Sequence, residues 1–160
     1  MSRLLPVLLL TAGALLAPTK GQGETDFNKL SDVLKTAVNL AIKDCNEKKL
    51  FKDHLNFFST IEPTSDNSFV DFNFYMKVTH CSKTNRHEHR GDCKFNDKRP
   101  LLDCVVCGRR HGNSIESPYI HCVPKKHLVK KHQTERKEKC DIYRPGQESL
   151  LFQRGCEGCY

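Results

Sequence analysis

Cysteines constrain the fold of this chain more than any other feature, because the 160 residues include nine of them. Six follow the order Cys81-x11-Cys93-x10-Cys104-x2-Cys107-x14-Cys122-x17-Cys140. In an oxidising compartment this spacing indicates a small disulfide-linked domain, whereas in a reducing one it would suggest zinc or redox chemistry. Spacing alone does not choose among the 15 possible pairings of six cysteines.

The N-terminus indicates which compartment applies. Arg3 precedes an almost entirely apolar run, Leu4–Leu16, and small residues then offer cleavage after Gly21 or Gly23. The pattern predicts a removable signal peptide over residues 1–23 and therefore a secreted, extracellular protein. The apolar run is shorter than the roughly 20 residues that span a bilayer. A retained membrane anchor is the alternative.

Positive charge is concentrated in the cysteine-rich half of the chain. The whole sequence has a formal charge of +7, and residues 81–140 hold fifteen lysines and arginines against seven acids. No aromatic stacking motif accompanies these charges, so nucleic acid is not expected as a partner. Heparan sulfate, anionic membranes or an acidic receptor surface fit such a charge distribution better.

The first regular element predicted after the signal peptide is one long amphipathic helix. Thr25 or Asp26 can cap it, and apolar residues recur at three- and four-residue steps from Phe27 to Cys45. Its opposite face carries charges of both signs, which favours packing on a sheet over binding to a membrane.

Four antiparallel strands are predicted to follow the helix. Apolar and polar side chains alternate in residues 70–78, as in a strand with one buried face. The predicted strands are residues 55–61, 70–78, 101–109 and 118–123, with a turn over residues 62–67 between the first two. The fold class is therefore α+β, with one N-terminal helix packed on a four-stranded sheet within a domain over residues 24–140. Residues 141–160 are predicted to form a flexible C-terminal tail.

The order of these motifs resembles the cystatin/cathelicidin superfamily. The resemblance is carried by Val78-Thr79-His80-Cys81, Asp92-Cys93-Lys94-Phe95, Cys104-Val105-Val106-Cys107, Ile120-His121-Cys122, His132-Gln133-Thr134, Cys140 and Tyr143-Arg144-Pro145-Gly146-Gln147. It implies a cystatin-like fold with disulfides Cys81–Cys93, Cys104–Cys122 and Cys107–Cys140. It also implies a secreted chemoattractant and adipokine that is made as a nearly inert precursor.

The resemblance places the activity in the C-terminal tail. It implies that extracellular serine proteases trim the precursor, so that a short peptide reaches a G-protein-coupled chemokine-like receptor. The resemblance implies that Tyr143, Pro145, Gly146 and Gln147 belong to the receptor-activating peptide. Because peptide ligands bind through a few buried anchors, Leu150, Leu151 and Phe152 are also expected to be receptor-activating residues. A trypsin-like enzyme would cut after Arg154. An inert terminus is the alternative.

Three cysteines exceed the family pattern: Cys45, Cys156 and Cys159. Cys45 is either a buried thiol on the helix or the partner of a tail cysteine, and such a bond would keep the precursor silent. The Cys-x-x-Cys pairs could instead bind zinc. Secretion favours disulfides over zinc at these pairs. We expect no metal or other cofactor, and no enzyme, because no catalytic arrangement can be argued from the scattered histidines.

Antimicrobial host defence of the cathelicidin type is the second function to consider. Its candidate residues are Lys125, Lys126, Lys130, Lys131, Arg136, Lys137 and Lys139. They could lie on an anionic membrane as a basic amphipathic helix, bind heparan sulfate, or form a solvated helix without a partner. Cysteine-protease inhibition is not expected, because the chain lacks tryptophan and a Gln-x-Val-x-Gly loop.

Overall fold

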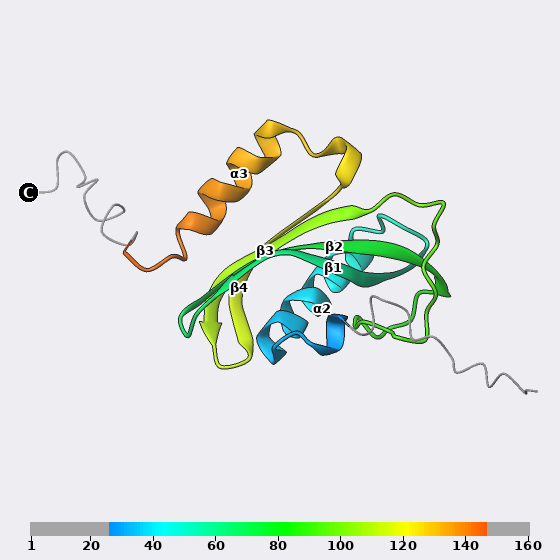
Figure 1. Cartoon of the computed structure of the whole chain (residues 1–160), viewed down its shortest axis with the longest axis horizontal. Helices are drawn as coiled ribbons and strands as arrows, with labels where there is room; N and C mark the ends of the chain where they lie inside the picture. The colour runs from blue at the N-terminus through cyan, green and yellow to red at the C-terminus, as the bar shows by residue number, and fades with distance from the viewer. Residues whose placement is uncertain (1–25, 147–160) are drawn as a thin grey trace, which may run out of the picture.

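The computed structural model describes residues 26–146, in which a sheet separates an inner helix from an outer one (Figure 1). The elements in chain order are α2 (Asp32–Glu47), β1 (Asp53–Ser65), β2 (Phe69–Ser82), β3 (Leu102–His111), β4 (Ser114–Pro124), the 3-10 helix η1 (Lys125–His127) and α3 (Lys130–Asp141). The strands pair antiparallel in the order β1-β2-β3-β4. The predicted α+β class, with one N-terminal helix on a four-stranded sheet, is confirmed.

The alternating pattern of β2 produces the core. Its even-numbered residues from Val70 to Val78 are buried beneath α2, while the odd-numbered ones face the other side of the sheet. Each large apolar side chain removed from water here contributes about 1.5–3 kcal/mol. In β3 every residue from Leu102 to Gly108 is buried, because α2 covers one face of that strand and α3 the other.

The predicted single N-terminal helix is wrong at its start. Helix α2 begins only after Ser31, whose extended backbone (ψ 158°) interrupts the helix between Phe27 and Asp32. Serine followed by an acidic first turn is a common helix start, so the local signal was present. Phe27 still packs on the core, 6.0 Å from the ring of Phe57, and stacks on His89 at 4.2 Å.

The first hairpin is longer than predicted. The expected turn over residues 62–67 is wrong for most of its length, because Glu62 pairs with Asn73 and Ser65 with Val70. The chain reverses just beyond, where the Asp66 carboxylate accepts the backbone N–H groups of neighbouring residues at 2.6 and 2.9 Å. Register shifts in β1 break its alternation, which explains why the predicted strand over residues 55–61 was shorter than the observed one.

Three disulfides link Cys81 to Cys93, Cys104 to Cys122, and Cys107 to Cys140. These are the pairs that the family resemblance implies. Each contributes roughly 2–4 kcal/mol to stability, and such a density is typical of extracellular proteins. None of the helices within residues 26–146 has the length and apolar character needed to cross a membrane.

Candidate functional site at the C-terminal helix

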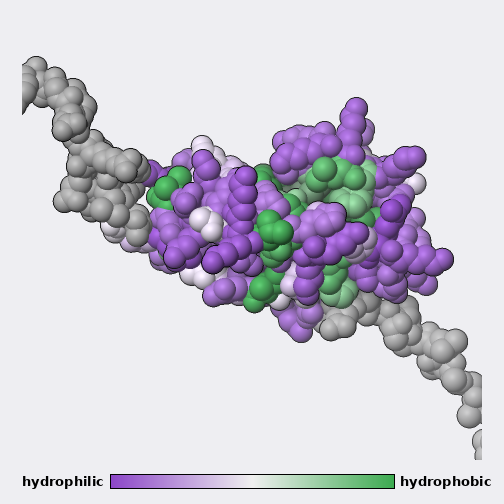
Figure 2. Space-filling view, turned by 90° about the horizontal axis from the view of Figure 1, so that it is seen from above, coloured by the Kyte–Doolittle hydropathy of each residue, from purple (hydrophilic) through white to green (hydrophobic). Residues whose placement is uncertain are grey.

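The candidate functional residues that fall within residues 26–146 lie on or near α3. This helix lies on the face of the sheet opposite to α2, which we call the outer face (Figure 1). This helix is polar along its length, and the two residues that it buries are Arg136 and Cys140. Figure 2 looks onto this face, where hydrophilic side chains dominate and hydrophobic ones form small separate areas. Helix α3 has no apolar stripe with which to enter a bilayer, which disfavours the amphipathic membrane helix, and membrane binding stays an untested prediction.

Arg136 fixes α3 to the sheet and is not part of the exposed basic patch. Its guanidinium donates to the carboxylate of Asp103 and, at 2.9 Å, to the carbonyl oxygen of the same residue. Both side chains are almost completely buried, at 7% and 4% exposure. Removing one partner of such a pair costs about 3–5 kcal/mol, because a charge is then left uncompensated in the interior.

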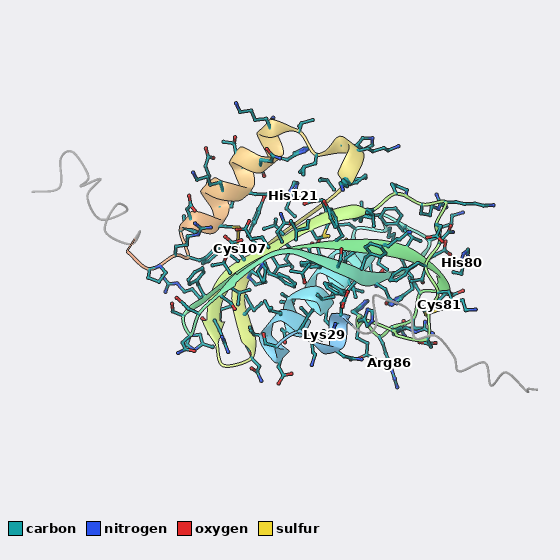
Figure 3. The ribbon with its side chains drawn as sticks, viewed as in Figure 1. Lys29, His80, Cys81, Arg86, Cys107 and His121 are labelled. Carbon is teal, nitrogen blue, oxygen red and sulfur yellow. A yellow bond between two sulfur atoms is a disulfide. The ribbon has the colours of Figure 1, made fainter. Side chains whose placement is uncertain are left out.

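The same arginine sets the protonation state of His121. Nε of Arg136 donates to Nδ1 of His121 at 2.9 Å, so that ring nitrogen is an unprotonated acceptor. Burial, and then the charge of Arg136, lower the pKa of His121. Figure 3 shows His121 between the sheet and α3. The contact between helix and sheet is thus made with a neutral imidazole.

The end of α3 is attached to the sheet by a covalent bond and a hydrogen bond. The Cys107–Cys140 disulfide joins β3 to the last turn of the helix. Two residues beyond the helix, the hydroxyl of Tyr143 donates to the carbonyl oxygen of Ser117 at 2.9 Å. Tyr143, within the segment predicted as the tail, therefore packs on the body of the domain.

Arg144, close to the end of the described residues, is attached to the sheet by an ion pair. Its Nη2 lies 2.8 Å from a carboxylate oxygen of Asp71 in β2, and its Nε lies 3.5 Å from Asp141. Pro145 and Gly146 are exposed, and Gly146 adopts a φ of +90°, which glycine tolerates best. The remaining predicted tail residues, namely Gln147, Leu150, Leu151, Phe152, Arg154, Cys156 and Cys159, lie outside the described residues, as does the predicted signal peptide.

The lysines of the predicted basic patch are exposed. They are Lys125, Lys126, Lys130, Lys131, Lys137 and Lys139. The ammonium group of Lys125 lies 4.6 Å from the ring centroid of Tyr75, a cation–π contact on the outer face of β2. Neither Tyr75 nor Asp103 could be recognised from the sequence as a contact of the basic segment. Both lie on strands that are distant in sequence from Lys125 and Arg136, and strand pairing brings them together.

Cys45 is a free thiol with no exposed surface. It lies in the core between α2 and the sheet, and burial raises its pKa to about 12. The predicted bond between Cys45 and a tail cysteine is therefore wrong for this structure. Of the two predicted alternatives, the buried apolar thiol is the one that the fold contains.

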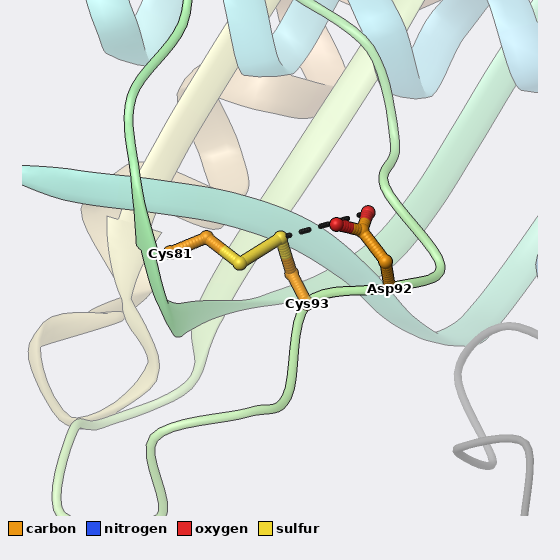
Figure 4. Close-up of side chains that lie close together, drawn as sticks. All are labelled: Cys81, Asp92 and Cys93. Carbon is orange, nitrogen blue, oxygen red and sulfur yellow. Dashed lines mark hydrogen bonds between the residues drawn. A yellow bond between two sulfur atoms is a disulfide. The ribbon is translucent and has the colours of Figure 1, made fainter. Parts of the chain in front are cut away.

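One group of side chains has the proximity of a metal site, but its chemistry does not fit a metal. Within residues 26–146, Cys81, Asp92 and Cys93 place ligand-type atoms within 4.8 Å of one another (Figure 4). The two sulfurs are bonded to each other, so neither is the thiolate that metals require. The 3.9 Å contact between Cys93 Sγ and Asp92 is likewise not a thiol hydrogen bond, since the sulfur carries no proton.

Comparison with known proteins extends the similarity over the whole chain. No protein-family model matches the sequence. A cystatin-like protein from Clarias batrachus is 30% identical over 166 aligned residues, which cover 97% of each chain. The similarity thus includes the N-terminal helix and the sheet as well as the cysteine-rich half.

Proposed function

The chain belongs to the cystatin-like proteins, and we propose that within this family it is a secreted, non-catalytic precursor of a chemoattractant and adipokine. In this proposal, C-terminal proteolysis by extracellular serine proteases converts it into the ligand of a G-protein-coupled chemokine-like receptor. The observation that carries the proposal is the attachment of Cys140, Tyr143 and Arg144 to the sheet immediately before the C-terminal segment.

This arrangement would allow the C-terminal segment to be cut without disturbing the domain. Within residues 26–146, the attachment nearest the C-terminus is the ion pair of Arg144 with Asp71, and the contacts described above are all made by residues up to Gly146. Cleavage after Arg154 would leave eight residues beyond Gly146, which reach at most about 28 Å when extended. The three hydrophobic anchors, Leu150 to Phe152, would then lie close to the new C-terminus.

The resemblance that supports this function is to chemerin, the retinoic acid receptor responder protein 2. It rests on the six-cysteine order, the polar His132-Gln133-Thr134 segment and the Tyr143-Arg144-Pro145-Gly146-Gln147 segment. The tail departs from that pattern, because Glu148 and Ser149 precede the hydrophobic anchors where chemerin continues directly into alternating aromatic residues. The activating peptide is accordingly proposed to be Gln147–Arg154 or a shorter form that ends at Phe152.

The proposal is tested with full-length protein purified from culture medium. The protein is treated with a trypsin-like protease, the cut is mapped by mass spectrometry, and both forms are assayed for migration of receptor-bearing cells. We expect migration only after a cut at Arg154, and none from an Arg154→Gln variant treated in the same way. A trimmed Phe152→Ala variant should fold normally, but it should need a clearly higher concentration than the trimmed wild type to attract cells.

The same preparation distinguishes the antimicrobial alternative. Killing of bacteria by uncut protein, or by a peptide of residues 125–139, without migration after trimming would replace the chemoattractant proposal. The helix within this segment does not favour that outcome, since it is polar along its length and has no apolar face for a bilayer.

A further inference from the structure

Two basic segments that are distant in the sequence lie side by side at the η1 end of the molecule. The backbone N–H of Lys125 donates to the carbonyl oxygen of Leu101 at 2.8 Å, and Leu102 pairs with Pro124. Lys98 and Arg99 are separated from Leu101 only by Pro100, so strand pairing brings them beside η1. The resulting basic end consists of Lys98, Arg99, Lys125, Lys126, Lys130 and Lys131, all of them exposed.

These six side chains are not neutralised by acidic neighbours. None of them forms an ion pair with another residue of the described part of the chain. The nearest acid in the sequence, Asp97, is engaged by Lys77 at 2.5 Å, and Asp103 is buried against Arg136. The first turn of α3 contains no acidic residue. The basic end therefore presents uncompensated positive charge to solvent, which attracts a polyanion.

The surroundings of the basic end favour a sulfated polysaccharide over a membrane. A peripheral membrane surface requires apolar side chains that enter the bilayer beside its lysines. Among the described residues, the exposed large apolar side chains are Leu50, Ile61, Val129 and Ile142, and only Val129 adjoins η1. A sulfated chain needs no such insertion, because sulfates interact directly with exposed ammonium and guanidinium groups.

We propose that the basic end is a binding site for heparan-sulfate-type glycosaminoglycans, assembled by the tertiary structure from the 98–99 and 125–131 segments. Lys125, held over Tyr75, gives the site one preorganised cation at its centre. The remaining five side chains extend from it along the loop before β3 and along the start of α3.

The site lies at the other end of α3 from residue 146, where the described chain ends. Ten helical residues, 132–141, separate the basic end from the segment that contains Tyr143, about 15 Å of helix. In Figure 1, η1 lies at one end of α3 and the C-terminal end of the described chain lies at the other. A protein held on the cell surface through its basic end would have residues 143–146, the end of the described chain, at the far end of α3 from the glycan. Binding would thus retain the protein in tissue without blocking either the protease or the receptor.

The test measures binding of full-length protein to a heparin dodecasaccharide and to non-sulfated heparosan of the same length at 150 mM NaCl. We expect binding to the sulfated chain only. The variants Lys98→Gln/Arg99→Gln and Lys125→Gln/Lys126→Gln should each weaken it about three- to tenfold and reduce its salt dependence. The matched control is Lys29→Gln/Arg86→Gln, which removes the same charge from the opposite side of the molecule (Figure 3) and should bind like the wild type.

Three results would overturn the proposal. Unchanged binding by Lys98→Gln/Arg99→Gln, with loss in the 125/126 variant, would show a linear basic segment instead of an assembled site. Equal losses in the control would show non-specific charge attraction. Stronger binding to vesicles containing 30% phosphatidylserine than to the dodecasaccharide would assign the surface to membranes. None of these results bears on receptor activation by the trimmed protein, so the two proposals can fail separately.

Discussion

The buried pair between Arg136 and Asp103 leads to a quantitative prediction about the attachment of α3. Arg136→Met keeps the length of the side chain but removes every hydrogen bond that the guanidinium donates to Asp103 and His121. The carboxylate of Asp103, 4% exposed, is then buried without a cation. We expect the free energy of unfolding to fall by about 3–5 kcal/mol, or roughly 10–20 °C in melting temperature for a domain of this size.

The assay is urea denaturation followed by circular dichroism, with hydrogen exchange to locate the change. Hydrogen exchange should accelerate in α3 far more than in α2, because α3 loses the contacts of Arg136 with the sheet. The Cys107–Cys140 disulfide would still hold the end of α3 to β3. The double variant Arg136→Met/Asp103→Asn removes the stranded charge and should recover at least half of the loss. Lys139→Met, on the exposed side of the same helix, should change stability by less than about 0.5 kcal/mol.

The reasoning would be refuted by an Arg136→Met variant within about 1 kcal/mol of the wild type. It would also be refuted by a double variant that is less stable than the single one. Either result would mean that the charge of Asp103 is not sealed beneath α3.

Two further predictions concern the partly buried His89 and the core residue Cys45. Burial and the nearby His54 lower the pKa of His89 to about 4, so its contribution to stability is complete above pH 6.5 and is lost as the pH falls toward 4. The ring nitrogens of His89 have no hydrogen-bond partner among the described residues, so His89→Phe should flatten the acid side of the stability curve without loss at pH 7. His127→Gln, on the surface, should leave the curve unchanged. Cys45, with a pKa of about 12 and no exposure, should resist iodoacetamide at pH 8 in native protein and react only in denaturant; mass spectrometry that finds it modified in native protein would contradict its burial.

Features that depend on neighbours along the chain could be predicted from the sequence. The strand β2 was recognisable because alternation every second residue reflects one buried face within a single strand. Helix α2 was recognisable because its apolar residues recur with a helical period. Its start was predicted too early, since the helix begins only after Ser31. The disulfide pairs, in contrast, came from family resemblance, since spacing leaves all pairings open.

Features that depend on contacts across strands emerged from the fold. Arg136 reads as one more cation in a basic segment, yet it is buried because Asp103 and His121 meet it from neighbouring strands. Lys98 and Arg99 join the lysines of η1 only because β3 pairs with β4.

The amino-acid sequence was thus sufficient for the class of fold, the position of its elements and the oxidised character of the domain, all of which follow from local periodicity and composition. The tertiary structure was needed to decide which cations are structural and which are exposed. The physical reason is that burial of a charge depends on the counter-charge that packs against it, and that partner is chosen by strand pairing over tens of residues instead of by any local pattern.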